Sequence, residues 1–370
     1  MDTPYDRTDI PTIATWGSVP NFLRRTHFLP RYNVRRGRIF REVWDISTIT
    51  IDGYHLDFNL PVAITPPFCL QATAQMSKIA STFSRLVRFN PKSNPSKILI
   101  GEPVDPKIDV GLALYQGQDV SVRPFSGTSV LSPGQKVEST ETIGRILSPL
   151  SQNEVGSIRC IGLNYASHAA EMKMAIPDLP TLFIKPSTSL ADPWPAPTVL
   201  PKITQVDSTG DYESEMVIVI GRDAKDVSEE EALDYVLGYT AANDVSSRTS
   251  QMNQSQWCFS KGFDTACPIG PALVSAAHFP DVSQFQIRGL KNGKVMQDCP
   301  LTDLIFSVPK LVSFLSQGTT LSAGTIILTG TPPGVGAAKN PKEFLKAGDE
   351  FAVELLPHVG TLINKTENQL

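Results

Sequence analysis

The stretch DYESEMVIVIG, residues 211–221, joins two spaced carboxylates directly to a short apolar run. Residues 216–220 predict a buried β-strand, because they form a continuous strand-sized run that ends at Gly221. Alternate residues of a strand point to the same face, so Glu213 and Glu215 are expected side by side. Their mutual repulsion is relieved if a cation binds between them or if one of them is protonated. Oxygen ligands favour Mg²⁺, Mn²⁺ or Ca²⁺ over zinc. The alternative is a solvated strand end with two exposed glutamates.

A third carboxylate, Asp244, follows a second apolar segment at residues 236–242, where a loop is expected to begin. Arg248 lies four residues further on and is suited to bind a substrate carboxylate through two parallel hydrogen bonds. The alternative for Arg248 is a structural ion pair with a nearby acid. Together these residues predict a site for a hard cation with a carboxylate-binding arginine beside it.

A histidine and a glutamate are spaced by three residues in NYASHAAEM, residues 164–172. On a helix His168 and Glu171 share a face. A carboxylate beside an imidazole fixes its tautomer and raises its basicity, as a general base for water requires. The alternative is a surface pair on an amphipathic helix.

The composition is that of a globular protein, with 370 residues, 41% hydrophobic and 19% charged. The net charge of -4 gives no basic footprint for nucleic acid, and no apolar run reaches the ~18 residues of a membrane helix. Five cysteines without a Cys-x-x-Cys pair favour a reducing compartment. We therefore expect a cytoplasmic protein without nucleic-acid or membrane partners, a mitochondrial location being the alternative.

Residues 1–75 differ from the rest of the chain, because they contain eight arginines and no lysine. We interpret them as a poorly ordered N-terminal extension, the alternatives being a partner-binding arm or sequence upstream of a start at Met76. Residues 76–150 alternate β-rich runs with turns and predict a small β subdomain. Residues 151–370 predict a β-dominated catalytic domain with few helices.

Local patterns also predict individual elements. Further strands are expected at residues 47–51, 98–103, 110–115 and 119–125. Helices are expected at residues 229–236, with Ser228 as N-cap, and at residues 307–315. Asn292-Gly293 between apolar runs predicts a two-residue β-hairpin turn.

Seven stretches, in this order, resemble the fumarylacetoacetate hydrolase superfamily: GLNYASHAAEM (162–172), FIKPST (183–188), DYESEMVIVIG (211–221), GYTAANDVSSRTSQ (238–251), SKGFDTACPIGP (260–271), NGKVMQD (292–298) and LTGTPPGVG (328–336). The resemblance covers most of the chain from Met76 on and is strongest with fungal members. It implies a mixed β structure with some helices, namely the β-roll of this superfamily preceded by a small N-terminal β subdomain. It also implies a homodimer.

The resemblance assigns roles to single residues. It implies that Glu213, Glu215 and Asp244 bind Mg²⁺ or Mn²⁺, and that Lys261 helps to hold charge developing on the substrate. It further implies that Lys185 lines the cavity, that Thr331 contacts the substrate carboxylate, and that a lid segment carries the water-activating pair His168 and Glu171.

The polar stretch 249–259 lies beside the loop that carries Asp244, and within it Gln251 is expected to contact the substrate and shape specificity. One departure is PHVGTL at residues 357–362, where the superfamily has a Gly-x-Gly-Thr-Leu turn, and we expect it to alter only a hairpin.

These residues predict a metal-dependent hydrolase that cleaves a carbon–carbon bond of an acylpyruvate-like oxo-acid through a metal-stabilised enolate. An oxaloacetate-type decarboxylase (a lyase) shares that enolate and is an alternative, as is an isomerase or hydratase of a related oxo-acid. A non-catalytic protein that keeps the metal site for structure or partner binding is the alternative from a different class.

Overall fold

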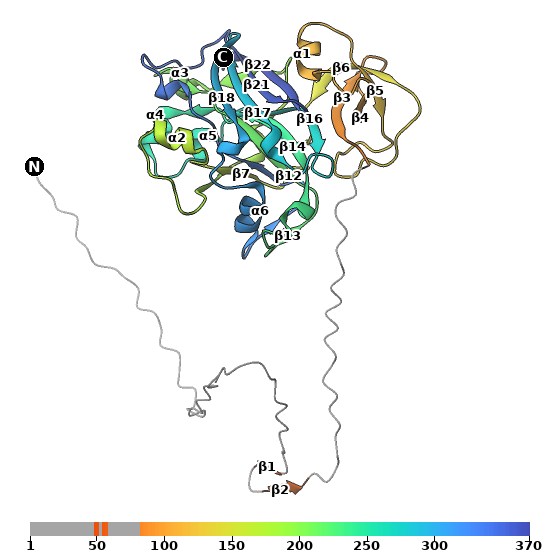
Figure 1. Cartoon of the computed structure of the whole chain (residues 1–370), viewed down its shortest axis with the longest axis vertical. Coiled ribbons are helices and arrows are strands. Elements are labelled where there is room, and N and C mark those ends of the chain that lie inside the picture. Colours follow the sequence, from red (N-terminus) through yellow and green to blue (C-terminus); the bar gives the residue numbers. More distant parts are fainter. Residues whose placement is uncertain (1–47, 52–53, 58–81) are drawn as a thin grey trace, which may run out of the picture. The chain divides into compact units, whose positions relative to one another are not determined.

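The computed structural model describes residues 48–51, 54–57 and 82–370, and it separates residues 1–72 from residues 73–370 as two units (Figure 1). Most of the predicted N-terminal extension therefore lies outside the described residues. Within it, β1 (Thr48–Ile51) pairs antiparallel with β2 (Tyr54–Asp57), which confirms the strand expected at residues 47–51. The division into residues 76–150 and 151–370 stays a prediction.

The larger unit is dominated by β-strands, as the sequence predicts. Its main sheet runs, in spatial order, through β4 (Leu99–Pro103), β5 (Ser121–Pro124), β6 (Glu141–Leu147), β3 (Arg85–Pro91), β16 (Cys267–Ser275), β14 (Val236–Asn243), β12 (Ser214–Ile220), β20 (Ile326–Leu328), β7 (Ile158–Ile161) and β8 (Leu182–Lys185), with β9 (Leu190–Ala191) added on β16. Since β3 also pairs with β4, the strands β3 to β6 close into a small barrel-like sheet.

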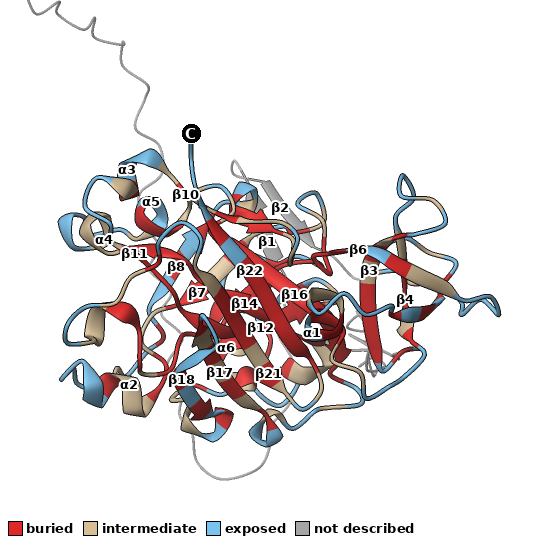
Figure 2. Ribbon diagram, turned by 90° about the horizontal axis from the view of Figure 1, so that it is seen from above, coloured by how far each residue is buried: buried red, intermediate tan, exposed pale blue. Residues whose placement is uncertain are grey.

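A second sheet packs on one face of the first. Its order is β10 (Thr198–Leu200), β22 (Gly360–Asn368), β21 (Glu350–Leu356), β17 (Gln286–Lys291) and β18 (Lys294–Pro300). Figure 2 shows the central strands of both sheets as buried. Met216 and Ile218 lie in the core between the sheets, whereas Val217 and Val219 lie in the core on the opposite face. Both faces of β12 are buried, which explains why its sequence is continuously apolar rather than alternating.

The described helices are short. They are α1 (Val110–Tyr115), α2 (Ala166–Glu171), α3 (Lys202–Gln205), α4 (Arg248–Asn253), α5 (Cys258–Lys261) and α6 (Val308–Ser316). Helix α6 confirms the prediction for residues 307–315, because Ser307 caps it by accepting from the backbone N–H of Lys310 at 3.3 Å. No helix among the described residues is long and apolar enough to cross a membrane.

The hairpin prediction is confirmed, because Asn292 and Gly293 connect β17 to β18 with φ values of 51° and 76°. The PHVGTL stretch also contains a hairpin turn, which joins β21 to β22.

Two element predictions are wrong. Residues 110–115 form α1 rather than a strand. Asp109 caps this helix by accepting from Leu112 N–H at 3.1 Å and also accepts from Thr361 N–H at 3.0 Å. A tertiary contact thus overrides a weak local β preference. Residues 229–236 contain just a 3₁₀ turn, Ala232–Tyr235, because Val236 already pairs with Ile220 in the sheet.

The elements around the candidate site gather at one end of the larger unit. Figures 1 and 2 both place α2, α4 and α5 at the end of the sheets that lies away from β3 to β6. Two short pairs complete the unit: β11 (Gly210–Asp211) with β15 (Ser246–Ser247), and β13 (Ala224–Lys225) with β19 (Thr320–Leu321). The β11–β15 pair brings the segments before β12 and after β14 together.

Candidate active site

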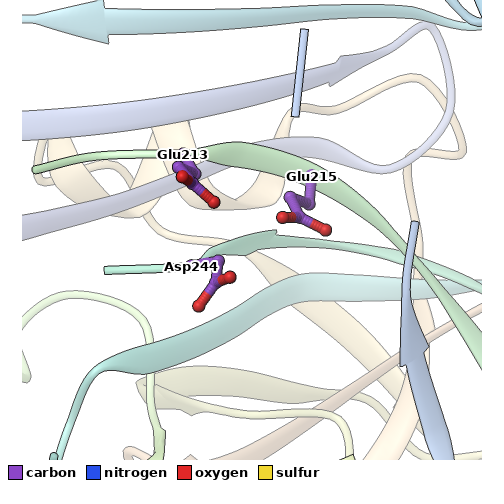
Figure 3. Close-up of side chains that lie close together, drawn as sticks. All are labelled: Glu213, Glu215 and Asp244. Atoms are coloured by element: carbon purple, nitrogen blue, oxygen red, sulfur yellow. The ribbon is translucent and has the colours of Figure 1, made fainter. Parts of the chain in front are cut away.

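Glu213, Glu215 and Asp244 meet where β12 and β14 run side by side (Figure 3). The antiparallel register places Ser214 opposite Asn243, so Glu213 lies opposite Asp244, and the Asp244 N–H donates to the Glu213 carbonyl at 2.8 Å. One oxygen from each of the three carboxyl groups lies within 4.8 Å of the others. Glu213 is 7% exposed and Glu215 1%, so the alternative of two solvated glutamates is wrong.

Three cationic side chains contact two of the carboxylates. Lys261 Nζ lies 2.7 Å from Glu213 Oε2 and 2.7 Å from Asp244 Oδ2. Lys185 Nζ pairs with Asp244 Oδ1 and donates to the Ala266 carbonyl at 2.7 Å. Arg248 Nη1 lies 2.7 Å from Glu213 Oε1.

Glu215 differs from its two neighbours. Among the described residues no lysine or arginine forms an ion pair with it, and its carboxylate accepts from the Gly330 N–H at 2.6 Å. Burial raises the pKa of Glu215 well above its usual range, and the carboxylates of Asp244 and Glu213 raise it further. Burial would also raise the pKa of Glu213, but Lys261 and Arg248 lower it to about 2.

Among the described residues Glu215 is therefore the carboxyl group of the cluster without a lysine or arginine partner, whereas Glu213 and Asp244 both have such partners. A buried set of carboxylate oxygens of this kind fits a hard divalent cation. The residues present thus agree with the ligand set expected from the sequence, while their role in metal binding stays a proposal.

Arg248 opens helix α4 at the edge of this cluster. Its Nε donates to Asp211 Oδ2 at 2.7 Å and its Nη1 donates to Gln251 Oε1 at 2.9 Å. Its Nη2 is buried and has no hydrogen-bond partner among the described residues. Buried polar groups are normally hydrogen-bonded, so an unpartnered guanidinium donor here is available to an acceptor such as a bound anion. Arg248 therefore forms the structural ion pairs of the alternative and also keeps one donor that could bind an anion, and its role in substrate binding stays a prediction.

Helix α2 forms where the sequence predicts it and brings His168 and Glu171 together. His168 Nδ1 lies 2.9 Å from Glu171 Oε2, and the two side chains are 13% and 25% exposed. The N–H of Gly334 donates to both carboxylate oxygens of Glu171, at 3.0 and 3.1 Å. The pair is thus docked on the Gly/Pro-rich turn at residues 329–336, rather than displayed on a free helix surface.

This turn contacts the carboxylate cluster as well, through Gly330. Gly330 and Gly334 have φ values of 93° and 107°, a region that favours glycine, and a Cβ on Gly334 would lie 2.1 Å from the Met296 carbonyl oxygen. Thr331 Oγ1 accepts from Gln297 Nε2 at 2.8 Å, so its own proton is free to donate.

Lys185 and Gln251, two residues predicted to bind substrate, form contacts with other residues of the site. Lys185 is completely buried behind Asp244, with its side chain engaged by that residue and by Ala266. Gln251 contacts Arg248 on the outer side of the cluster and is partly buried. Lys185 therefore supports Asp244 through an ion pair, and its predicted role in substrate binding stays a prediction.

Sequence reasoning missed several residues that hold the site together. Asp211 is fully buried and binds Arg248, although it opens the quoted stretch and its charge was visible there. Asp303 accepts from the Ser167 N–H at 3.0 Å and from its hydroxyl, and it fixes the start of α2 across 136 positions of sequence. Gln297, in the NGKVMQD stretch, orients Thr331 by donating to its hydroxyl oxygen. No local pattern indicates the last two contacts.

Known proteins resemble this chain over much of its length. Residues 157–367 match the family described as fumarylacetoacetate (FAA) hydrolase C-terminal. The chain is 44% identical over 298 residues to a caffeoylpyruvate hydrolase of Neonothopanus nambi, covering 80% of this chain and 96% of that protein. It is 39% identical over 220 residues to the mitochondrial oxaloacetate tautomerase Fahd2a of Rattus norvegicus, covering 59% of this chain and 68% of that protein.

Solved structures show the same fold. A 5-carboxymethyl-2-hydroxymuconate delta-isomerase from Mycobacterium smegmatis aligns with a TM-score of 0.62 at 29% identity and covers 77% of this chain and 100% of its own. A fumarylacetoacetate hydrolase from Exiguobacterium antarcticum aligns with a TM-score of 0.64 at 26% identity and covers 77% of this chain and 99% of its own. The chain belongs to the fumarylacetoacetate hydrolase family, as its seven stretches indicate, and is an enzyme of that fold.

Proposed function

We propose that this protein is a metal-dependent hydrolase that cleaves the carbon–carbon bond of an acylpyruvate-like oxo-acid. The observation that carries the proposal is the docking of His168 and Glu171 on Gly334, in the same turn whose Gly330 contacts Glu215. A base for water thus belongs to the same structural unit as the carboxylate cluster. The match to the caffeoylpyruvate hydrolase, which covers 96% of that protein, supports the same assignment.

Glu213, Glu215 and Asp244 would hold the cation, with Lys185 and Lys261 neutralising the charge that remains. When bound there, Mg²⁺ or Mn²⁺ would supply Lewis-acid stabilisation of the negative charge that develops on the oxo-acid. The Ca²⁺ ion, with the same preference for oxygen ligands, is the second choice.

The remaining steps fall to the side chains. Arg248 Nη2 and the Thr331 hydroxyl are free donors for the carboxylate of the substrate. His168, held in one tautomer by Glu171, takes a proton from water. The resulting hydroxide attacks the acyl carbonyl, the carbon–carbon bond breaks, and the electron pair passes to the pyruvate fragment as its enolate. The ammonium of Lys261 shares this charge, and the enolate then takes up a proton to give pyruvate beside the released carboxylic acid.

An oxaloacetate-directed activity is the second candidate, because several relatives are named oxaloacetate tautomerases. Decarboxylation or isomerisation of such an acid requires the same carboxylate and enolate contacts but no attacking water. We also propose a homodimer, and a cytoplasmic or mitochondrial location, the latter supported by relatives whose names include "mitochondrial".

A coupled assay separates the two candidates. Purified protein with Mg²⁺ or Mn²⁺ would be tested on oxaloacetate and on acylpyruvates with aliphatic, fumaryl and aromatic acyl groups, with EDTA as control. Metal-dependent cleavage of an acylpyruvate that collapses in His168→Ala supports the hydrolase. Carbon dioxide release or tautomerisation of oxaloacetate that survives His168→Ala, without acylpyruvate cleavage, contradicts it. Activity toward none of these acids would point to a more specialised substrate or to the non-catalytic alternative.

A further inference from the structure

Asp211 is a buried carboxylate outside the candidate metal-ligand set of Glu213, Glu215 and Asp244. It forms no hydrogen bond with His168 or Glu171 among the described contacts. It is 0% exposed and accepts four N–H donors. Its Oδ1 accepts from the backbone of Tyr212 at 2.9 Å and of Gly336 at 2.8 Å. Its Oδ2 accepts from the backbone of Ala337 at 2.9 Å and from Arg248 Nε at 2.7 Å. One side chain therefore joins α4 to the end of the turn at residues 329–336.

The contact with Nε fixes the guanidinium plane of Arg248. The group is a rigid fork, so once Nε points at Asp211 and Nη1 points at Glu213, the direction of Nη2 follows. Nη2 is the donor without a partner among the described residues. Asp211 and Glu213 thus hold the guanidinium of Arg248 through two different nitrogens, each at 2.7 Å.

The backbone contacts of Asp211 fix the other side of the same region. Gly336 and Ala337 end the turn that carries Thr331, whose hydroxyl is the second free donor. Arg248 and Thr331 come from segments far apart in the sequence. Asp211 is the described side chain that hydrogen-bonds both to Arg248 and to the end of that turn.

We propose that Asp211 is a positioning residue for substrate recognition, which sets Arg248 and the 329–336 turn at the spacing that a small oxo-acid carboxylate requires. This inference rests on the proposed function, since it concerns the carboxylate of the same substrate. It adds a residue outside the expected ligand, base and carboxylate-binding set.

Asp211→Asn tests the inference, because the carboxamide keeps one acceptor oxygen and turns an NH₂ group toward N–H donors. We expect KM for an acylpyruvate to rise about 10- to 100-fold, the range for losing a hydrogen bond to a charged group. The effect on kcat should be smaller. In an Arg248→Gln background, Asp211→Asn should add little, because the residue acts through Arg248.

Two measurements separate positioning from general damage. The Mn²⁺ dissociation constant, from titration followed by electron paramagnetic resonance, should change less than about threefold, well below the ~10–100-fold typical when a metal-site support is lost. Tyr212→Phe is the matched control: it removes the 3.1 Å bond from the Tyr212 hydroxyl to the Gly334 carbonyl of the same turn, next to Asp211, and should leave KM unchanged.

Additive effects of Asp211→Asn and Arg248→Gln, or an equal rise of KM in Tyr212→Phe, would overturn the inference. If Asp211→Asn does not fold, Asp211→Ser, which is smaller and keeps one acceptor, takes its place. Calorimetry of oxalate binding to the Mn²⁺-loaded protein distinguishes this inference from the proposed function. Weaker oxalate binding in the variant, in a protein that cleaves no acylpyruvate, would sustain the positioning role and reject the hydrolase.

Discussion

The backbone N–H of Gly334 donates to both carboxylate oxygens of Glu171, at 3.0 and 3.1 Å. This contact attaches helix α2, which carries His168, to the turn that also contacts Glu215 through Gly330. The candidate base and the candidate metal site are therefore held by one short segment of backbone, residues 329–336.

Glu171→Gln should lower kcat for acylpyruvate cleavage about 10²- to 10⁴-fold, the range for losing general base catalysis. Gln still packs against the turn but cannot pair with the imidazole of His168 as a carboxylate does. Steady-state kinetics with Mg²⁺ would measure the effect. The exposed Glu229→Gln serves as control and should behave as wild type. Full activity in Glu171→Gln would remove the pair from the mechanism.

Glu215→Gln should abolish tight binding of a divalent cation. Among the described residues no lysine or arginine pairs with the Glu215 carboxyl group, and Gln would remove one of the three carboxylates that could bind the ion. The Mn²⁺ dissociation constant should rise by more than the ~100-fold at the upper end for outer-shell changes. Lys261→Met serves as the comparison variant: it should still bind Mn²⁺ measurably, but its kcat should be much lower. Unchanged Mn²⁺ affinity in Glu215→Gln would place the metal elsewhere.

Lys185→Met should destabilise the fold rather than raise KM. The ammonium is buried with Asp244 and Ala266, and removing one partner of a buried pair costs about 3–5 kcal/mol. Urea unfolding of the metal-free protein would measure the loss. A variant of wild-type stability with a specific increase in KM would instead support Lys185 as a substrate-binding residue, as the family resemblance implies.

Asp303→Asn should loosen α2, because Asp303 accepts from both the N–H and the hydroxyl of Ser167. Amide hydrogen exchange in residues 166–171 should become faster, and kcat should fall while Mn²⁺ binding is unchanged. Exchange in α6, which lies outside this contact, is the internal reference. Exchange at wild-type rates in 166–171 would show that other contacts hold the helix.

His358 should make the fold more sensitive to acid. Burial and the nearby charge of Arg85 lower its pKa in the folded state below the usual value near 6.5. The unfolded chain then binds the proton more readily, so stability is greatest above about pH 6.5 and falls as pH drops toward the lowered pKa. His358→Phe, which keeps an aromatic ring against Phe279, should show a smaller loss in urea unfolding between pH 7.5 and 5.5. An identical loss in both proteins would contradict this.

The sequence alone determined the parts of the site that depend on local order. The run at residues 216–220 is continuously apolar and therefore predicts a buried strand, whereas the burial of the carboxylates before it was decided by the structure. Helix α6 and the Asn292-Gly293 hairpin follow from capping and turn chemistry, which act within a few residues. Residues 110–115 show the limit of prediction from local patterns, because α1 depends on Asp109 and its contact with Thr361, far along the chain.

The tertiary structure decided which charges are compensated and which donors are left free. The sequence shows Arg248 as a cation near acids, but only the fold pairs the buried Lys185 with Asp244 and leaves Nη2 of Arg248 without a partner among the described residues. Asp211, Asp303 and Gly334 act across long separations in sequence, through contacts that exist once strands and turns have packed. Such contacts depend on distances in space, which residue types and their spacing along the chain do not specify.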